Sequence, residues 1–143
     1  MPPSIYWYDF ETTGIDPIVD RAIQFAGVRT DLDLNVIDEP QNIFCRPGDD
    51  VIPAPEAMAV TGILMSELQQ RGHSEAEFCQ HIIEQFTVPQ TCVAGYNSIR
   101  FDDEFTRQML YRNFYEPYAR EWQGGNSRWD VIDMFRMAYA LRP

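Results

Sequence analysis

Two acidic residues, Asp9 and Glu11, are the first side chains of the sequence that could carry out chemistry. They come at the end of a β-branched and aromatic run, residues 4–9, which predicts a strand. Because residues two apart on a strand point to the same face, both carboxylates would meet one site, while Phe10 would point into the core. Two hard oxygen ligands suit Mg²⁺ or Mn²⁺. The Asp-x-Glu pattern is a weak signal by itself, so its surroundings must decide.

A third carboxylate, Asp102, lies at a second predicted junction between a strand and a helix. Residues 91–96 form a short apolar run, and residues 102–114 show helical spacing. Strand ends and the starts of the helices that follow them are where α/β sheets place ligands. We therefore expect Asp9, Glu11 and Asp102 to converge within about 6 Å around a metal. The alternative is that Asp102 only stabilises the start of its helix.

The elements that must position these acids follow a recognisable order. Strands are predicted at residues 4–9, 22–30, 36–46 and 91–96, with residues 31–35 as a hairpin connection. Helices are predicted at residues 55–60, after the N-caps Ser66 and Ser74, at 102–114 and at 130–141. Three early strands indicate an antiparallel meander, and the whole order predicts an α/β domain with a mixed sheet flanked by helices. No strand is predicted after the last helix, so we expect the sheet to be truncated.

Length and composition are those of a single domain. The sequence has 143 residues, of which 45% are hydrophobic. No apolar run approaches the roughly 20 residues of a membrane span, and the N-terminus lacks the zones of a signal peptide. A cytoplasmic location is therefore expected. The widely spaced Cys45, Cys79 and Cys92 fit neither a disulfide framework nor a zinc site, so we expect reduced, buried thiols.

Charge is unevenly distributed along the chain. The net charge is −11, and all eleven cations are arginines. Residues 1–96 hold fifteen acids and four arginines, whereas residues 97–143 hold seven of each. An acidic first part could attract metal cations, and the guanidinium groups of the second part suit phosphates and bases. For most of the acids the alternative is a plain solvated surface.

Several motifs together resemble the DEDD superfamily of 3′→5′ exonucleases. Y-D-F-E-T-T-G at residues 8–14 resembles its first motif, and N-S-I-R-F-D at 97–102 resembles its second. A recurrent Thr-Gly-Ile segment is matched at residues 61–63. A closer resemblance, to the branch of this superfamily that degrades DNA, is carried by residues 20–31, 86–92, 95–104, 111–119 and 126–130. These motifs span nearly the whole chain and are far more specific than Asp-x-Glu alone.

The resemblance implies an RNase H-like fold and a hydrolase that removes nucleotides from the 3′ end of single-stranded DNA, in repair or recombination. It implies two metal ions per site, Mg²⁺ or Mn²⁺, bound by the catalytic Asp9, Glu11 and Asp102, with Glu11 also contacting the terminal nucleotide. A fourth metal-binding Asp and a general-base His are implied as well. His73 and His81 precede the second motif and are expected to be surface residues. We therefore expect residues 1–143 to be an incomplete exonuclease domain that is inactive or weakly active by itself.

The same resemblance implies how the substrate is held. Four residues match positions that contact single-stranded DNA: Arg107, Tyr118, Trp122 and Arg136. Tyr118 and Trp122 are four apart and would share one face of a helical turn. The alternative for these residues is core packing and surface ion pairs; Trp129 is expected in the core. The implied partners are single-stranded DNA and, through regions outside this chain, single-stranded DNA-binding protein, with no membrane.

Three other functions compete with this interpretation. Another DEDD enzyme, a polymerase proofreading subunit or an oligoribonuclease, would share the first two motifs but not residues 86–89 or 111–115. A non-catalytic nucleic-acid-binding fragment would fit the missing His and Asp. A phosphatase with Asp9 as nucleophile is disfavoured, because that chemistry usually needs Asp where this sequence has Glu11.

Overall fold

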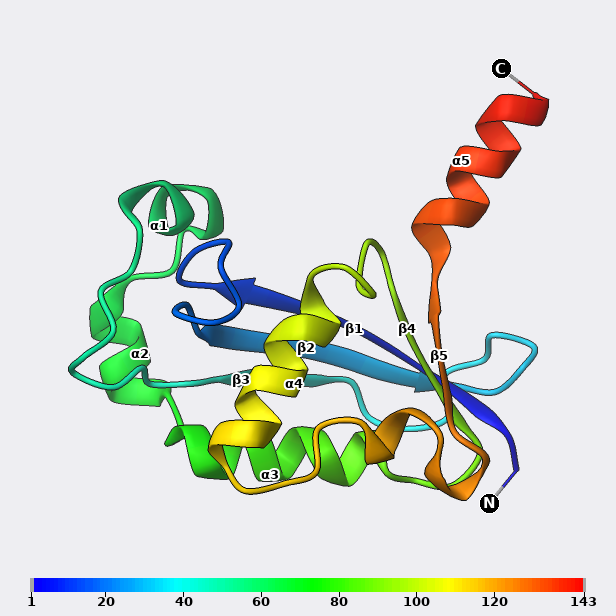
Figure 1. Ribbon diagram of the computed structural model, residues 1–143, viewed down its shortest axis with the longest axis horizontal. Helices are drawn as coiled ribbons and strands as arrows, with labels where there is room; N and C mark the ends of the chain where they lie inside the picture. Colours follow the sequence, from blue (N-terminus) through cyan, green and yellow to red (C-terminus); the bar gives the residue numbers. More distant parts are fainter. Residues whose placement is uncertain (1, 143) are drawn as a thin grey trace.

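The computed structural model describes residues 2–142 and is built around one five-stranded sheet (Figure 1). The strands are β1 (Ser4–Thr12), β2 (Ala22–Thr30), β3 (Gln41–Phe44), β4 (Thr91–Gly95) and β5 (Ser127–Asp130), in the spatial order β3-β2-β1-β4-β5. The pairs β1–β2 and β2–β3 are antiparallel, whereas β1–β4 and β4–β5 are parallel. The predicted meander and mixed sheet are thereby confirmed.

Helices follow the first three strands. They are α1 (Pro55–Thr61), α2 (Met65–Arg71), α3 (Glu75–Phe86), α4 (Asp102–Arg112), the 3-10 turns η1 (Ala119–Glu121) and η2 (Gln123–Gly125), and α5 (Val131–Leu141). Helices α3 and α4 cover one face of the sheet. Figure 1 shows α3 and α4 beside the sheet, and α5 extending away from the body. No residue of α5 is buried. Among residues 2–142, no helix combines the length and apolar character needed to cross a bilayer.

Alternation along β1 creates the main core and leaves the acids outside it. Tyr6, Tyr8 and Phe10 are buried and pack with Phe25 of β2 and Phe86 of α3, where their rings lie 5 to 6 Å apart. Residues at the intervening positions face the other side of the sheet, as the period of two requires. The prediction that Phe10 points into the core is confirmed. Two of the three free cysteines, Cys45 and Cys79, are buried, and Cys92 is half-buried.

Two predicted elements have different limits in the structure. The strand predicted over residues 36–46 is reduced to β3, with single bridges at Val36 and Cys45, because Pro40 has no N–H to donate to a ladder. Ser66 does not cap α2. The helix begins at Met65 with Leu64 as its N-cap, two residues before Ser66, and the Glu67 carboxylate accepts a hydrogen bond from the Leu64 N–H at 3.0 Å. The predicted capping box of Ser74 is confirmed.

The structure contains one strand that the sequence did not predict, β5, and it lies before the last helix rather than after it. The four-residue β5 pairs in parallel with β4 and leads directly into α5, whose start is capped by the Asp130 carboxylate. Trp129 on β5 is 46% exposed, so the prediction that it lies in the core was wrong. Helix α4 ends at Arg112, two residues before the predicted end, and Phe114 adopts the left-handed conformation with φ 64°.

Candidate active site

Asp9 and Glu11 lie on the face of β1 opposite the aromatic core. Asp9 is exposed and Glu11 is half-buried, and the strand bulges directly after Glu11. Desolvation raises the pKa of both carboxyls, and the charge of Asp9 raises the pKa of Glu11 further. The predicted shared face is therefore present, and the charge of Asp9 acts on Glu11.

Asp102, the first residue of α4, is brought to the same strand by a hydrogen bond. Its Oδ1 accepts the backbone N–H of Phe10 at 2.9 Å, so α4 begins beside the segment that separates Asp9 from Glu11. The side chain is buried, and this burial raises the pKa of Asp102 to about 7, with a further contribution from the charge of Asp9. A segment 92 residues away along the chain thus supplies the third acid.

These three acids lack the cationic partners that the neighbouring buried Asp103 has. Within residues 2–142, none of them forms an ion pair, whereas the adjacent Asp103 pairs with both Arg120 and Arg128. The same residues contain no group of three or more His, Cys, Asp or Glu side chains arranged to hold a metal ion. The structure therefore places the three predicted ligands around one part of β1, but does not show the expected three-carboxylate convergence.

The surface beside Glu11 is hollowed. Residues from β1, the following loop, α1 and the start of α4 enclose about 510 Å³, and the walls include Glu11, Ile15, Val60 and Phe101. The Thr61 of the Thr-Gly-Ile segment also contributes to this hollow. An apolar cavity with a carboxylate at one side has the character of a site for a planar, partly polar ligand.

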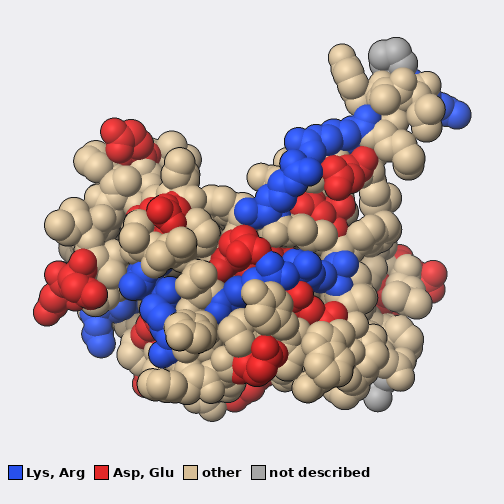
Figure 2. Space-filling view, viewed as in Figure 1, with Lys and Arg blue, Asp and Glu red and all other residues tan. Residues whose placement is uncertain are grey.

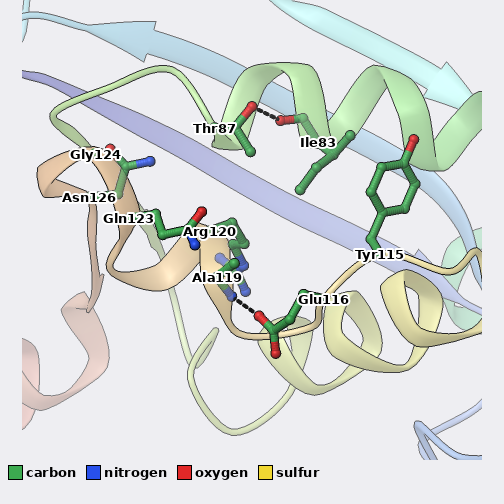
Figure 3. Close-up of a pocket in the computed structure, with 9 residues that line it drawn as sticks. All are labelled: Ile83, Thr87, Tyr115, Glu116, Ala119, Arg120, Gln123, Gly124 and Asn126. Carbon is green, nitrogen blue, oxygen red and sulfur yellow. Dashed lines mark hydrogen bonds between the residues drawn. The ribbon is translucent and has the colours of Figure 1, made fainter.

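A second pocket is lined by none of the predicted site residues. It encloses about 300 Å³ between the end of α3 and residues 115–126 (Figure 3). Arg120 lines it while reaching Asp103 on its other side. The proposed metal ligands and strand-binding residues contribute nothing to its walls.

The four predicted strand-binding residues occupy three different settings. The Arg107 guanidinium binds Glu121 at 2.8 and 3.0 Å, contacts Glu104, and lies 4.8 Å from the centre of the Tyr118 ring. Tyr118 and Trp122 flank η1 and are 53% and 65% exposed, which excludes the core alternative for both. The prediction that they share one face of a helical turn was wrong, because η1 between them is a short 3-10 turn that ends at Glu121.

Arg136 is the fourth of these residues and lies on α5. Its only ion pair in the part of the chain described is with Asp133, at 3.3 Å, and its side chain is 57% exposed. Figure 2 shows basic and acidic side chains interleaved over the middle of this face of the molecule. Both arginines predicted to bind the strand thus have acidic partners, Arg107 in a more buried setting than Arg136.

Two acids with structural roles at the site gave no sequence signal that set them apart. Asp130 accepts hydrogen bonds from the N–H groups of Asn97 and Ile99 and so shapes the loop before α4. Asp103 accepts three side-chain hydrogen bonds, although its position suggested only a charge near a helix start. Their partners come from segments distant in sequence, and spacing alone could not reveal them.

Comparison with known proteins identifies the family of this chain. Residues 6–143 match the RNase T family, which is described as exonuclease. Exodeoxyribonuclease I of Haemophilus influenzae is 53% identical over 140 residues, which cover 98% of this chain and 30% of the relative.

Solved structures of exonuclease I are similar to this chain in sequence and in fold. Exonuclease I from Methylocaldum szegediense is 62% identical with a TM-score of 0.96, over 99% of this chain and 30% of that one. Escherichia coli exonuclease I in complex with a dA16 oligonucleotide is 51% identical with a TM-score of 0.96, over 99% of this chain and 31% of that one. The chain spans about 30% of the length of these relatives. Its sequence match and its mixed α/β sheet together show that the chain belongs to the RNase T family of exonucleases.

Proposed function

We propose that this chain forms the first part of the nuclease domain of a metal-dependent 3′→5′ exonuclease that hydrolyses single-stranded DNA to nucleotides, with a role in DNA repair or recombination. One observation carries the proposal: Asp9, Glu11 and Asp102 surround one segment of β1 without any cationic partner among residues 2–142. Relatives that are exodeoxyribonucleases, one of them solved with an oligonucleotide, support the substrate class.

The chemistry of the donor set fits a hard divalent cation. All three side chains offer carboxylate oxygens, the ligands that Mg²⁺ and Mn²⁺ prefer. Desolvation raises the pKa of all three carboxyls, and no cationic side chain among residues 2–142 offsets this effect. A bound cation would supply the positive charge that stabilises the ionised carboxylates. Asp102 would be held by the Phe10 N–H through one oxygen and offer the other. These three residues would hold Mg²⁺ or Mn²⁺, two ions by the family resemblance, which would lower the pKa of an attacking water and stabilise the charge that develops on the phosphate.

Full activity on this account requires groups that residues 1–143 do not supply. The family resemblance implies a general-base His and a fourth Asp. The two histidines of the chain, His73 before α3 and His81 within it, lie together with ring centres 5.1 Å apart. The backbone of His73 forms an isolated β-bridge with Cys45. Both histidines therefore lie near β3 and α3, and neither of them lines the hollow beside Glu11. We propose that a longer polypeptide provides both groups.

The substrate would run from the hollow beside Glu11 across α4. The terminal nucleotide would occupy the hollow, where Phe101 and Ile15 offer apolar surface to a base. Exposed Tyr118 and Trp122 would stack further bases, and Arg107 and Arg136 would bind phosphates. Arg107 would have to exchange Glu121 or Glu104 for a phosphate oxygen. Single-stranded DNA-binding protein is the proposed partner, through regions outside this chain.

The function is tested by a nuclease assay on a polypeptide of the relatives' full length that contains this chain. Single-stranded DNA labelled at its 3′ end should release labelled mononucleotide at once in Mg²⁺, and EDTA should stop the reaction. The same DNA labelled at its 5′ end should release label only when digestion is nearly complete. Binding without cleavage would favour the non-catalytic alternative, and early internal cuts would exclude an exonuclease.

Trp122 should contribute strongly to strand binding. Trp122→Ala should raise the Kd for single-stranded DNA by roughly 5- to 150-fold, equivalent to about 1–3 kcal/mol, because a stacked base loses its aromatic partner. The effect should be similar for poly(dA) and poly(dT), since every base has a face to stack.

Trp129→Ala is the matched control, because Trp129 is also an exposed tryptophan but lies on β5 outside the proposed track. Fluorescence anisotropy with labelled oligonucleotides gives both Kd values. An unchanged Kd for Trp122→Ala in a folded protein would remove Trp122 from the binding surface.

A further inference from the structure

The carboxylate of Asp103 is the centre of a buried polar cluster that the proposed mechanism does not use. Asp103 is 1% exposed and accepts the Tyr8 hydroxyl at 2.6 Å, Arg120 Nη2 at 2.9 Å and Arg128 Nη1 at 3.1 Å. These donors come from β1, η1 and β5, so one carboxylate joins three elements to the start of α4. A buried acid with this many charged and hydroxyl donors is firmly oriented.

The members of this cluster are the immediate neighbours of the proposed metal ligands. Tyr8 precedes Asp9 on β1, and Asp103 follows Asp102 on α4. The backbone on the other side of Asp9 is tied as well, because the Phe10 N–H donates to Asp102. Two hydrogen bonds, one on each side of Asp9, therefore fix the first turn of α4 against β1.

The arginines of the cluster are themselves held in place. Arg120 is 2% exposed and its guanidinium lies 5.1 Å from the centre of the Phe86 ring in the core. Arg128 also contacts Glu121 at 3.2 Å, and Glu121 in turn binds Arg107. The cluster is thus continuous from the core of the sheet to a proposed phosphate-binding residue.

We propose that Asp103 and Tyr8 are positioning residues that set the separation between the carboxylates of Asp9 and Asp102. This inference rests on the proposed function, since it assigns the hydrogen bond between Asp103 and Tyr8 a role in the same metal site. The bond fixes how far α4 stands from β1, and that distance decides whether one cation can reach both acids. Metal sites depend on such outer groups because ligand distances of about 2.0–2.6 Å leave little tolerance.

The decisive variant is Tyr8→Phe, which removes the hydroxyl and keeps the ring that packs on Phe10 and Phe86. Its matched control is Tyr6→Phe. Tyr6 lies two residues earlier on the same buried face, and its hydroxyl has no hydrogen-bond partner within residues 2–142. Both variants lose one buried oxygen, and only the first loses the contact with Asp103.

The measurements are made on the polypeptide of the relatives' full length. For Tyr8→Phe we expect kcat to fall about 10-fold or more, and the Mn²⁺ concentration at half-maximal activity to rise by a similar factor. The KM for single-stranded DNA should stay within about twofold, because the strand-binding residues are untouched. Tyr6→Phe should match the wild type in all three.

Calorimetric titration with Mn²⁺ alone gives a second measurement that does not depend on turnover. Weaker Mn²⁺ binding by Tyr8→Phe than by Tyr6→Phe supports the positioning role. Equal Mn²⁺ affinity and equal kcat in the two variants would overturn it, even with an active wild type. A wild type that binds Mn²⁺ but does not cleave DNA would instead contradict the proposed function and leave the positioning comparison intact.

Discussion

Asp102→Asn should stabilise the metal-free protein at pH 8 by up to about 4 kcal/mol in the free energy of unfolding. Burial raises the pKa of Asp102 from 3.8 to about 7, and a tenfold change in an acid dissociation constant corresponds to about 1.4 kcal/mol. A carboxyl whose pKa is raised by folding stabilises the native state fully only below its unfolded pKa. This stability is lost as the pH rises from about 4 to about 7, and at pH 8 the loss is complete. Asparagine avoids the loss and still offers Oδ1 to the Phe10 N–H.

Urea denaturation in EDTA at pH 8 and at pH 4.5 measures this difference. The gain from Asp102→Asn should be largest at pH 8 and shrink to about 1 kcal/mol at pH 4.5. Asp33→Asn is the control, because Asp33 is exposed on the loop after β2. Saturating Mg²⁺ should stabilise the wild type and have less effect on the variant, since binding to the native state adds stability. A variant that is less stable than the wild type at pH 8 without metal would show that the carboxylate serves the fold rather than a cation.

The acids on β1 could be identified from the sequence because their position depends on local structure. The β-branched and aromatic run before Asp9 predicts a strand, in which side chains alternate between the two faces of the sheet. This alternation places Asp9 and Glu11 on the face opposite Phe10. Asp102 could be assigned to a helix start for the same local reason. No local pattern, however, indicates that Asp102 Oδ1 would accept the N–H of Phe10, which requires two distant segments to meet.

The features that the sequence did not predict depend on contacts between segments that are distant along the chain. Strand β5 has only four residues and draws its hydrogen bonds from β4, so its own sequence carries little strand signal. Trp129 was expected in the core because tryptophan is usually buried, but its side of β5 is open among the residues described. The partners of Asp103 lie 17, 25 and 95 residues away and have no spacing that a sequence pattern could detect.

Asp9→Asn should lower kcat on single-stranded DNA by roughly 10²- to 10⁴-fold, the rate equivalent of several kcal/mol of charge stabilisation by the metal. The loss follows because Asn offers a neutral oxygen where a cation needs a charged one. Asp9 is exposed, so the fold should not suffer. The Kd for DNA measured in Ca²⁺ should change little, because base stacking and the arginines remain.

Single-turnover digestion of 3′-labelled DNA in Mg²⁺ provides the rate, with Asp33→Asn again as the variant that removes a charge elsewhere. Wild-type turnover by Asp9→Asn would exclude a metal-binding role for this residue. A large rise in the Kd for DNA with unchanged kcat would move Asp9 from the chemistry to substrate binding.

Asp9, Glu11 and Asp102 are proposed to hold a divalent cation together. Anomalous diffraction from crystals soaked in Mn²⁺ tests this proposal directly, because the signal locates manganese without assumptions about activity. We expect a peak beside β1, with oxygens of Asp9 and Asp102 at roughly 2.0–2.4 Å and Glu11 reaching the same ion or a second one. If manganese at saturating concentration bound elsewhere and contacted none of these three carboxylates, the proposed metal site would be wrong.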